Sequence, residues 1–298
     1  MKLHRPHRLG ILPTVVLAAI LSLPFTSCVK DDLQNTPHPT LGALEIEPDY
    51  SQRSSDAEIP GAFYALIDKK WPDPATDAEM KGTKGVFPEL IAPGKHTLTA
   101  LTRGENIKVT KELVWVAPDS KEKKFGAGLA GPFFLGMQEI DVQADDMLRA
   151  KPVMKQYGRA MRVELTTVQG DPSEVDSITC MLAGTATMVD LFTGELGWPA
   201  TVIAPMKQVG NKFIANFRIL GIVMTEGQEI FIRIKYKDGM VLWMSAMVTE
   251  MLQGDKFNDS LEEYVFKDDL YLPIDAETSV TINGWQLGNG DGEEAEAH

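Results

Sequence analysis

Few residues of this 298-residue chain have the types and spacing that chemistry on a substrate requires. No two histidines have the spacing of metal ligands, and the five are scattered as His4, His7, His38, His96 and His298. The sequence has no Gly-x-Ser-x-Gly elbow and no His-Glu-x-x-His helix. We therefore predict no catalytic residue, no metal site, no cofactor and no small-molecule substrate, so the chain is not expected to be an enzyme.

One glycine-rich segment matches the spacing of a cofactor-binding loop. Residues 125–131 have the glycine spacing of dinucleotide-binding loops, which lie between a strand and a helix. Here a charged segment precedes the glycines and Pro132 follows them, so we interpret the segment as a flexible loop.

Cys28 is the residue whose surroundings predict a modification. Residues 1–8 are basic, residues 9–23 are almost entirely apolar, and small residues precede the cysteine. This pattern is typical of the signal peptide of a bacterial lipoprotein, and the apolar run is shorter than the roughly 20 residues of a membrane-spanning helix. Residues 1–27 are thus predicted to be removed, leaving a lipid on Cys28. The run Lys30-Asp31-Asp32 resembles the signal that sends lipoproteins of the Bacteroidota to the outer face of the outer membrane; a solvated tether is the alternative.

Charge excludes one class of partner. Residues 1–27 hold three basic and no acidic residues, so the remainder has 26 Lys and Arg against 42 Asp and Glu, a net charge of -16. A field of this sign repels phosphate backbones, which argues against nucleic acid. The only other cysteine, Cys180, alternates with Ile178 and Leu182, so we expect a buried thiol in a strand and no disulfide.

Short strand-like segments separated by turn residues recur along the mature chain. We expect a flexible tether over 28–43, one β-domain over 44–147, a second over 158–287, and a disordered acidic tail over 288–298. Hairpin turns are expected at residues 103–106 and 236–239. Strands 175–182 and 185–192 are expected to pair across residues 183–184, and a short helix is expected within 249–263. The fold class is all-β, as two tandem antiparallel β-sandwiches, with strands predicted over 43–47, 62–68, 95–102, 107–116, 139–144, 159–168, 175–182, 185–192, 212–220, 228–235, 240–248 and 279–287.

The sequence resembles the fimbrillin-associated anchor lipoproteins of type V pili in the Bacteroidota. The stretches that carry this resemblance are 28–33, 92–100, 178–194, 217–221 and 280–285. It implies two transthyretin-like β-sandwich domains, an outer-membrane location facing outward, and fimbrial subunits as partners.

The resemblance also suggests where strands could exchange. In the pilus subunits of such fibres, a protease cuts after a basic residue and removes an amino-terminal strand, and a strand of another subunit fills the groove. Arg53 is the matching exposed site here, and an anchor is expected to stay uncut. The strand carrying Val280, Ile282 and Trp285 could either complete its own domain, which we favour, or be donated to a neighbour.

A surface glycan-binding lipoprotein of a polysaccharide-uptake system is the alternative function. Such proteins stack sugars on exposed aromatic rings. Trp71 and Trp198 lie beside turns and are the candidates, whereas Trp115 and Trp243 lie in strands and are expected in the core.

Overall fold

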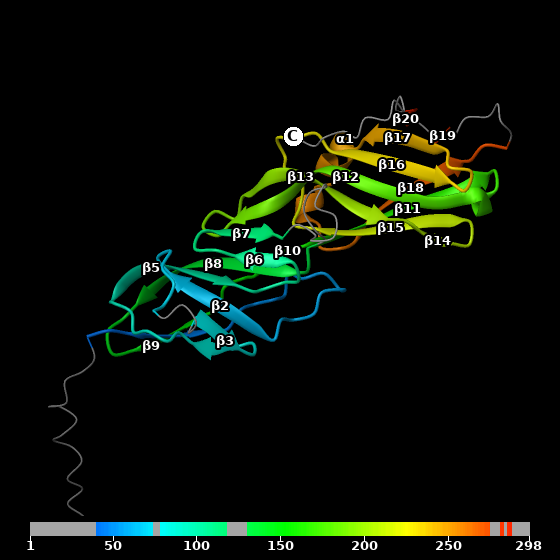
Figure 1. Ribbon diagram of the computed structural model, residues 1–298. Helices are drawn as coiled ribbons and strands as arrows, with labels where there is room; N and C mark the ends of the chain where they lie inside the picture. The colour runs from blue at the N-terminus through cyan, green and yellow to red at the C-terminus, as the bar shows by residue number, and fades with distance from the viewer. Residues whose placement is uncertain (1–39, 74–77, 118–129, 275–280, 283–284, 288–298) are drawn as a thin grey trace, which may run out of the picture. The chain divides into compact units, whose positions relative to one another are not determined.

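The computed structural model describes residues 40–73, 78–117, 130–274, 281–282 and 285–287 (Figure 1). The described residues belong to one compact unit. Nearly all of their regular secondary structure is β-strand, so the prediction of an all-β fold is confirmed. Cys28, the segment 30–32, Val280, the tail 288–298 and the glycines before Ala130 lie outside the described residues.

Two sheets are formed mainly by the first half of the chain. The smaller one has the order β4-β1-β9, and its central strand pairs antiparallel with β4 and parallel with β9. The larger one is antiparallel, with the order β10-β8-β5-β2-β3. Their strands are β1 (Ala43–Ile46), β2 (Ala62–Ile67), β3 (Glu79–Lys81), β4 (Gly85–Val86), β5 (Gly94–Leu101), β8 (Phe133–Val142), β9 (Met147–Ala150) and β10 (Lys155–Tyr157).

Two further sheets hold most of the second half. Their orders are β14-β15-β11-β18-β19 and β20-β17-β16-β12-β7-β6, with β13 also paired to β12. A short helix, α1 (Thr249–Gly254), follows β17, as predicted. The strands are β6 (Ile107–Val109), β7 (Leu113–Val116), β11 (Arg159–Gln169), β12 (Val175–Asp190), β13 (Leu196–Pro205), β14 (Lys207–Val209), β15 (Lys212–Ile219), β16 (Glu229–Tyr236), β17 (Val241–Met247), β18 (Tyr264–Tyr271), β19 (Thr281–Ile282) and β20 (Gln286–Leu287).

Strict alternation of apolar and polar residues explains why these segments are strands. In β16, Ile230, Ile232 and Ile234 are all fully buried, and the residues between them are partly exposed. Such a period of two places one face of a strand in a core. Cys180 follows the same pattern in β12 and is fully buried, as expected, and burial raises the pKa of its thiol.

The described residues form four apolar clusters. The smallest surrounds Tyr50 and Phe134, and the other three hold the sheets together. One lies between the two sheets of the second half, and another between β1 and the sheet that contains β2, β5 and β8. The third cluster connects the two halves, since Leu66 and Phe133 of the first half lie in it with Val189 of β12. The hairpin β6–β7 also pairs with β12. Strands from the first predicted domain therefore join a sheet of the second, and the domain boundaries stay a prediction.

Two predicted hairpins are wrong. Residues 103–106 do not connect paired strands, because β5 pairs with β2 and β8 while β6 pairs with β7. Residues 175–182 and 185–192 do not fold back on each other either: β12 is continuous through Gly184, where its pairing with β13 shifts register. Gly184 has a φ of +73° and forms a bulge in place of a turn. The predicted turn at 236–239 does connect the paired strands β16 and β17.

Several strands escaped prediction. Pro199 within β13 and the charged Lys267, Asp268 and Asp269 within β18 broke the apolar pattern. The predicted boundary between the two domains falls within residues 145–158, but this segment contains β9 and β10, which complete the two sheets of the first half.

The bulge at Gly184 should be sensitive to substitution. A Cβ added there would lie 2.4 Å from the carbonyl oxygen of Gly227, whereas at Gly210, with a φ of +63°, nothing lies within 4 Å. Both Gly→Ala changes incur the cost of a left-handed backbone, about 1–2 kcal/mol. We expect Gly184→Ala to lower the free energy of unfolding by about 1 kcal/mol or more beyond Gly210→Ala, as measured by urea denaturation. Equal losses would contradict the close packing at the bulge.

Candidate functional site

The first described strand lies in the middle of its sheet, directly after the predicted tether. Leu44 and Ile46 of β1 are fully buried against residues of β2, β5 and β8. Backbone hydrogen bonds extend this pairing past the strand, from Glu47 N to Ala150 O at 2.9 Å and from Asp49 N to Pro152 O at 2.9 Å. The chain is thus paired on both sides from Gly42 to Ile46, and from Glu47 to Asp49 the pairing continues only on the side of β9.

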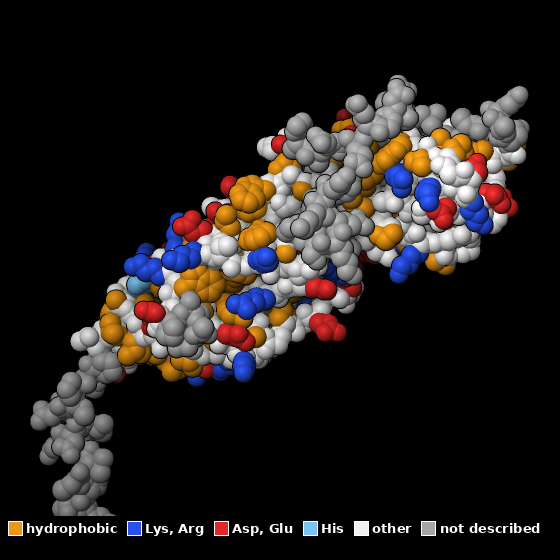
Figure 2. Space-filling model, in the orientation of Figure 1, with side chains coloured by type: hydrophobic (Ala, Val, Ile, Leu, Met, Phe, Trp, Pro, Cys, Tyr) orange, Lys and Arg blue, Asp and Glu red, His pale blue; other side chains and the backbone are white. Residues whose placement is uncertain are grey.

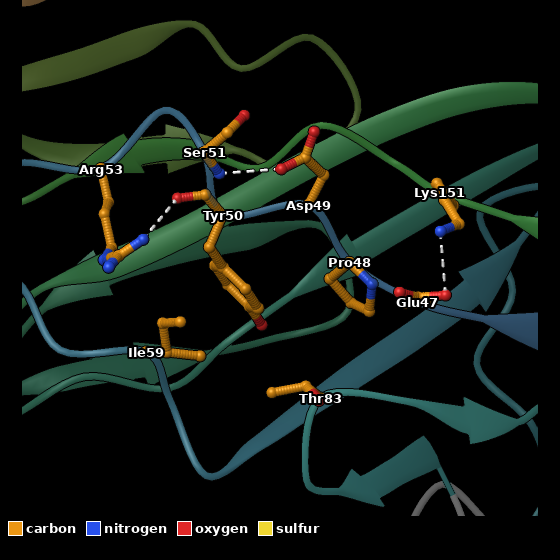
Figure 3. Close-up of a pocket in the computed structure, with 9 residues that line it drawn as sticks. All are labelled: Glu47, Pro48, Asp49, Tyr50, Ser51, Arg53, Ile59, Thr83 and Lys151. Carbon is orange, nitrogen blue, oxygen red and sulfur yellow. Dashed lines mark hydrogen bonds and ion pairs between the residues drawn. The ribbon is translucent and has the colours of Figure 1, made fainter.

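A pocket of about 470 Å³ lies at the end of this segment (Figure 3). Lys151 forms an ion pair with Glu47 at 3.1 Å, and the carboxylate of Asp49 accepts a hydrogen bond from the backbone N–H of Ser51 at 2.8 Å. These charges are paired with groups of the protein itself and form a polar rim around the pocket. The lining residues are Glu47, Pro48, Asp49, Tyr50, Ser51, Arg53, Ile59, Thr83 and Lys151.

Tyr50 connects the pocket to the interior. Its ring lies edge-on to Phe134, with centroids 5.2 Å apart, and Figure 3 shows the side chain pointing between Pro48 and Ile59 toward Thr83. Burial raises the pKa of Tyr50 to about 12, so the phenol is neutral at physiological pH. Its hydroxyl has no hydrogen-bond partner among the residues the structure describes.

Arg53 is exposed, as predicted, but the residue after it is not. Its guanidinium donates to the carbonyl oxygen of Tyr50 at 3.2 Å. Ser54 is 2% exposed, and its backbone N–H donates to the side-chain oxygen of Gln156 at 2.7 Å. Gln156 is itself 1% exposed and donates back to the Ser54 hydroxyl at 2.9 Å.

Two further contacts hold the segment that follows. The hydroxyl of Ser55 donates to Glu262 at 3.2 Å, and the carboxylate of Asp56 forms an ion pair with Arg218. Proteases cut most readily at exposed loop tips, where the backbone is free to enter their active sites. The peptide bond between Arg53 and Ser54 therefore joins an exposed residue to a buried, hydrogen-bonded one.

The predicted carboxyl-terminal strand lies at the other end of the described chain. β19 pairs with β18, and β20 pairs with β17, so these short strands lie on both sheets of the second half. Ile282 is 2% exposed in the core, and Trp285 packs on Phe266 while its indole donates to Asp268 at 3.0 Å. Ile282 and Trp285 thus pack within the same molecule that contributes them. Donation of this segment to a neighbouring subunit stays a prediction.

The tryptophans differ from expectation at two positions, since neither Trp115 nor Trp243 lies in a core. Trp115 of β7 is partly exposed, with the ammonium of Lys108 over its ring. Trp198 is 62% exposed with a φ of +54°, and Trp71 is partly buried with its indole donating to Lys111 O at 3.3 Å. Trp243 was expected in the core but is 36% exposed, because it lies on the outer face of β17 beneath the guanidinium of Arg233. Trp198 is therefore the indole with the most open ring face.

Arg53 could be recognised in the sequence as an exposed basic residue, whereas Tyr50 and Gln156 could not be recognised as its neighbours. Gln156 lies in the segment interpreted as a boundary, and no local pattern shows that its side chain meets Ser54, 102 residues earlier. Among the described residues, no group of three or more His, Cys, Asp or Glu could hold a metal ion. None of the helices in the described ranges is long and apolar enough to cross a bilayer.

Comparison with known proteins identifies structures that share the fold of this chain at low sequence identity. No protein-family model matches the chain, and no curated protein matches it. Among solved structures, a candidate adhesin from Bacteroides ovatus has a TM-score of 0.57 at 12% identity, covering 82% of this chain and 97% of that one. The fimbrial anchor protein Mfa2 from Porphyromonas gingivalis has a TM-score of 0.55 at 12% identity, covering 83% and 98%.

A candidate polysaccharide-binding protein from Bacteroides thetaiotaomicron also shares the fold, with a TM-score of 0.51 at 8% identity, covering 84% of this chain and 99% of that one. The resemblance to fimbria-associated proteins is thus confirmed at the level of the fold.

The contact between Ser54 and Gln156 should control cleavage after Arg53. Gln156→Met keeps the size of the side chain but leaves the Ser54 N–H buried without an acceptor, which costs about 1–3 kcal/mol. If local opening precedes cleavage, the rate of cutting by an arginine-specific protease should rise about 5- to 150-fold. Mass spectrometry of samples taken during a limited digest measures this rate of cleavage after Arg53.

Gln208→Met on the exposed strand β14 is the matched control and should leave the rate unchanged. Rapid cleavage of the unmodified protein after Arg53 would show that the hydrogen bonds between Ser54 and Gln156 do not protect this peptide bond.

Proposed function

We propose that this chain is an outer-membrane lipoprotein, facing outward, that acts as a structural anchor or assembly subunit of a fimbria. The lipid is attached to Cys28, and Lys30, Asp31 and Asp32 direct export to the outer face. Two or three acyl chains hold such a protein firmly, because each buried methylene contributes about 0.8 kcal/mol. In this role the chain performs no chemistry, and its partners are other fimbrial subunits.

The observation that carries this proposal is the position of β1. The strand that follows the tether is the centre of a sheet, and its two inward side chains lie in a core. Tension between a membrane lipid and a fibre would then be transmitted through β1 into the body of the protein. Loss of residues 28–53 would remove this strand and the lipid together.

The fold shared with the fimbrial anchor protein Mfa2 supports a fimbrial role, and the hydrogen bonds that hold Ser54 support the anchor over a polymerising subunit. A polymerising subunit needs its amino-terminal strand to leave. Here the segment from Gly42 to Asp56 is held by paired strands, by Gln156 and by Arg218.

Replacing the lipidated residue tests the anchor. In cells carrying Cys28→Ala, fibres containing this protein should appear in the culture medium, because their covalent attachment to the lipid is lost. Cys180→Ala, which changes the buried thiol, is the matched control and should leave fibres on the cells. Quantitative immunoblots of cell and medium fractions measure the partition. Equal retention by both variants, or isolation of the native protein without any fimbrial subunit, would contradict the proposal.

Glycan binding is the second candidate, and Trp198 is the observation that favours it. Its exposed indole face suits stacking against a sugar ring. If the chain binds surface polysaccharide, Trp198→Ala should weaken retention on immobilised glycan at least tenfold, whereas Trp71→Ala should change it little. Unchanged retention in Trp198→Ala would argue against this role.

A further inference from the structure

The sheet β4-β1-β9 has an outward face as well as the buried one. Leu44 and Ile46 point into the core, so Ala43 and Glu45 point outward. Residues directly paired across a sheet share a face, which places Met147, the partner of Ala43, and Val86, the partner of Glu45, on the same outward side.

Two more apolar side chains extend this face. Gly42 faces inward, since a Cβ there would lie 2.5 Å from the buried side chain of Val142. Leu41 therefore faces outward. Ile91 is bridged to Gly42 and is buried, so its neighbour Leu90 also faces outward.

We call the set Leu41, Ala43, Val86, Leu90 and Met147 the outer apolar face. Its four large members are exposed by 37% at Leu41, 52% at Val86, 56% at Leu90 and 48% at Met147. Figure 2 shows hydrophobic side chains gathered around the end of the body where the described chain begins. Contiguous exposed apolar surface on a folded protein commonly marks an interaction site.

Charged groups border the face. Glu45 is held between Lys84 at 2.8 Å and Arg149 at 3.0 Å, and the hydrogen bond from Lys84 lowers the pKa of its carboxyl. On the side of β9, Asp145 and Asp146 precede Met147. An apolar centre with a charged rim is suited to the boundary between lipid tails and hydrated headgroups.

Chain length decides what lies against this face. The outer apolar face starts at Leu41, and only residues 28–39 separate the described chain from Cys28. A fully extended peptide spans at most about 3.6 Å per residue, so these twelve residues reach no more than about 43 Å. A lipid on Cys28 therefore keeps the outer apolar face within about 43 Å of the membrane surface, because the tether joins the body at this face.

We propose that the outer apolar face rests on the membrane into which the lipid on Cys28 inserts, so that β1 is both the attachment strand and part of a membrane-contacting surface. This inference depends on the lipidation in the proposed function. It gives the protein two contacts with the bilayer: the acyl chains and the side chains of the outer apolar face. Two contacts fix the orientation of the body, which a single flexible tether does not.

Fluorescence of the full mature lipoprotein in vesicles of phosphatidylethanolamine and phosphatidylglycerol tests this. Because Cys180 is fully buried and the lipid occupies the Cys28 sulfur, Met147→Cys provides a single reactive thiol for a polarity-sensitive dye. Val209→Cys, at a 60% exposed residue of β14, is the matched control. We expect a blue-shifted emission and several-fold stronger quenching by spin-labelled lipid at position 147 than at 209. Leu90→Asp in the labelled Met147→Cys protein should reduce that quenching.

The outcomes separate the two proposals. Water-like emission at both positions, with the lipid on Cys28 verified by mass spectrometry, would overturn the membrane contact and leave the anchor standing. Absence of lipid on Cys28 would overturn both. A blue shift at 147 that grows with the protein-to-lipid ratio, without quenching by the lipid, would assign the face to contacts between copies and also overturn the proposal.

Discussion

The pairing of β1 between β4 and β9 is the constraint on which the rest of the structure depends. This four-residue strand contributes Leu44 and Ile46, both fully buried, to the core of the first half. Its removal would expose the apolar faces of β2, β5 and β8 and leave both β4 and β9 with unpaired edges. Unpaired edges and bare apolar surface are sites of association with other chains. Keeping β1 in place is therefore what keeps this half of the protein closed.

The contacts beyond β1 strengthen the same connection. The segment after Arg53 reaches Gln156 next to β11, and Asp56 reaches Arg218 at the end of β15. A shared apolar cluster and the pairing of β7 with β12 join the two halves as well. A force applied at the tether would thus act on a network of strands and side chains and not on one strand alone. This arrangement suits a part that must hold a load.

Much of this fold could be predicted from the sequence, because alternation in segments such as β15 and β16 records which face is buried. The long strand β12 was misinterpreted because a glycine at a bulge and a glycine at a turn have the same local sequence. Similarly, β18 carries charges that the β-sheet tolerates near its edge. Only part of the site could be predicted. Arg53 is recognisable as a basic residue in a polar segment, whereas the hydrogen bond between Ser54 and Gln156 forms only when the folded chain brings these distant residues together. The outer apolar face depends in the same way on which strands become neighbours.

The most direct test of the account is the intact mass of this protein recovered from native outer membranes together with its fibre. The account predicts a single chain that begins at lipidated Cys28 and continues unbroken through Arg53 and Ser54. A chain that begins at Ser54, without lipid, would show that β1 leaves the protein and would contradict the proposed role of β1 as the permanent connection to the membrane.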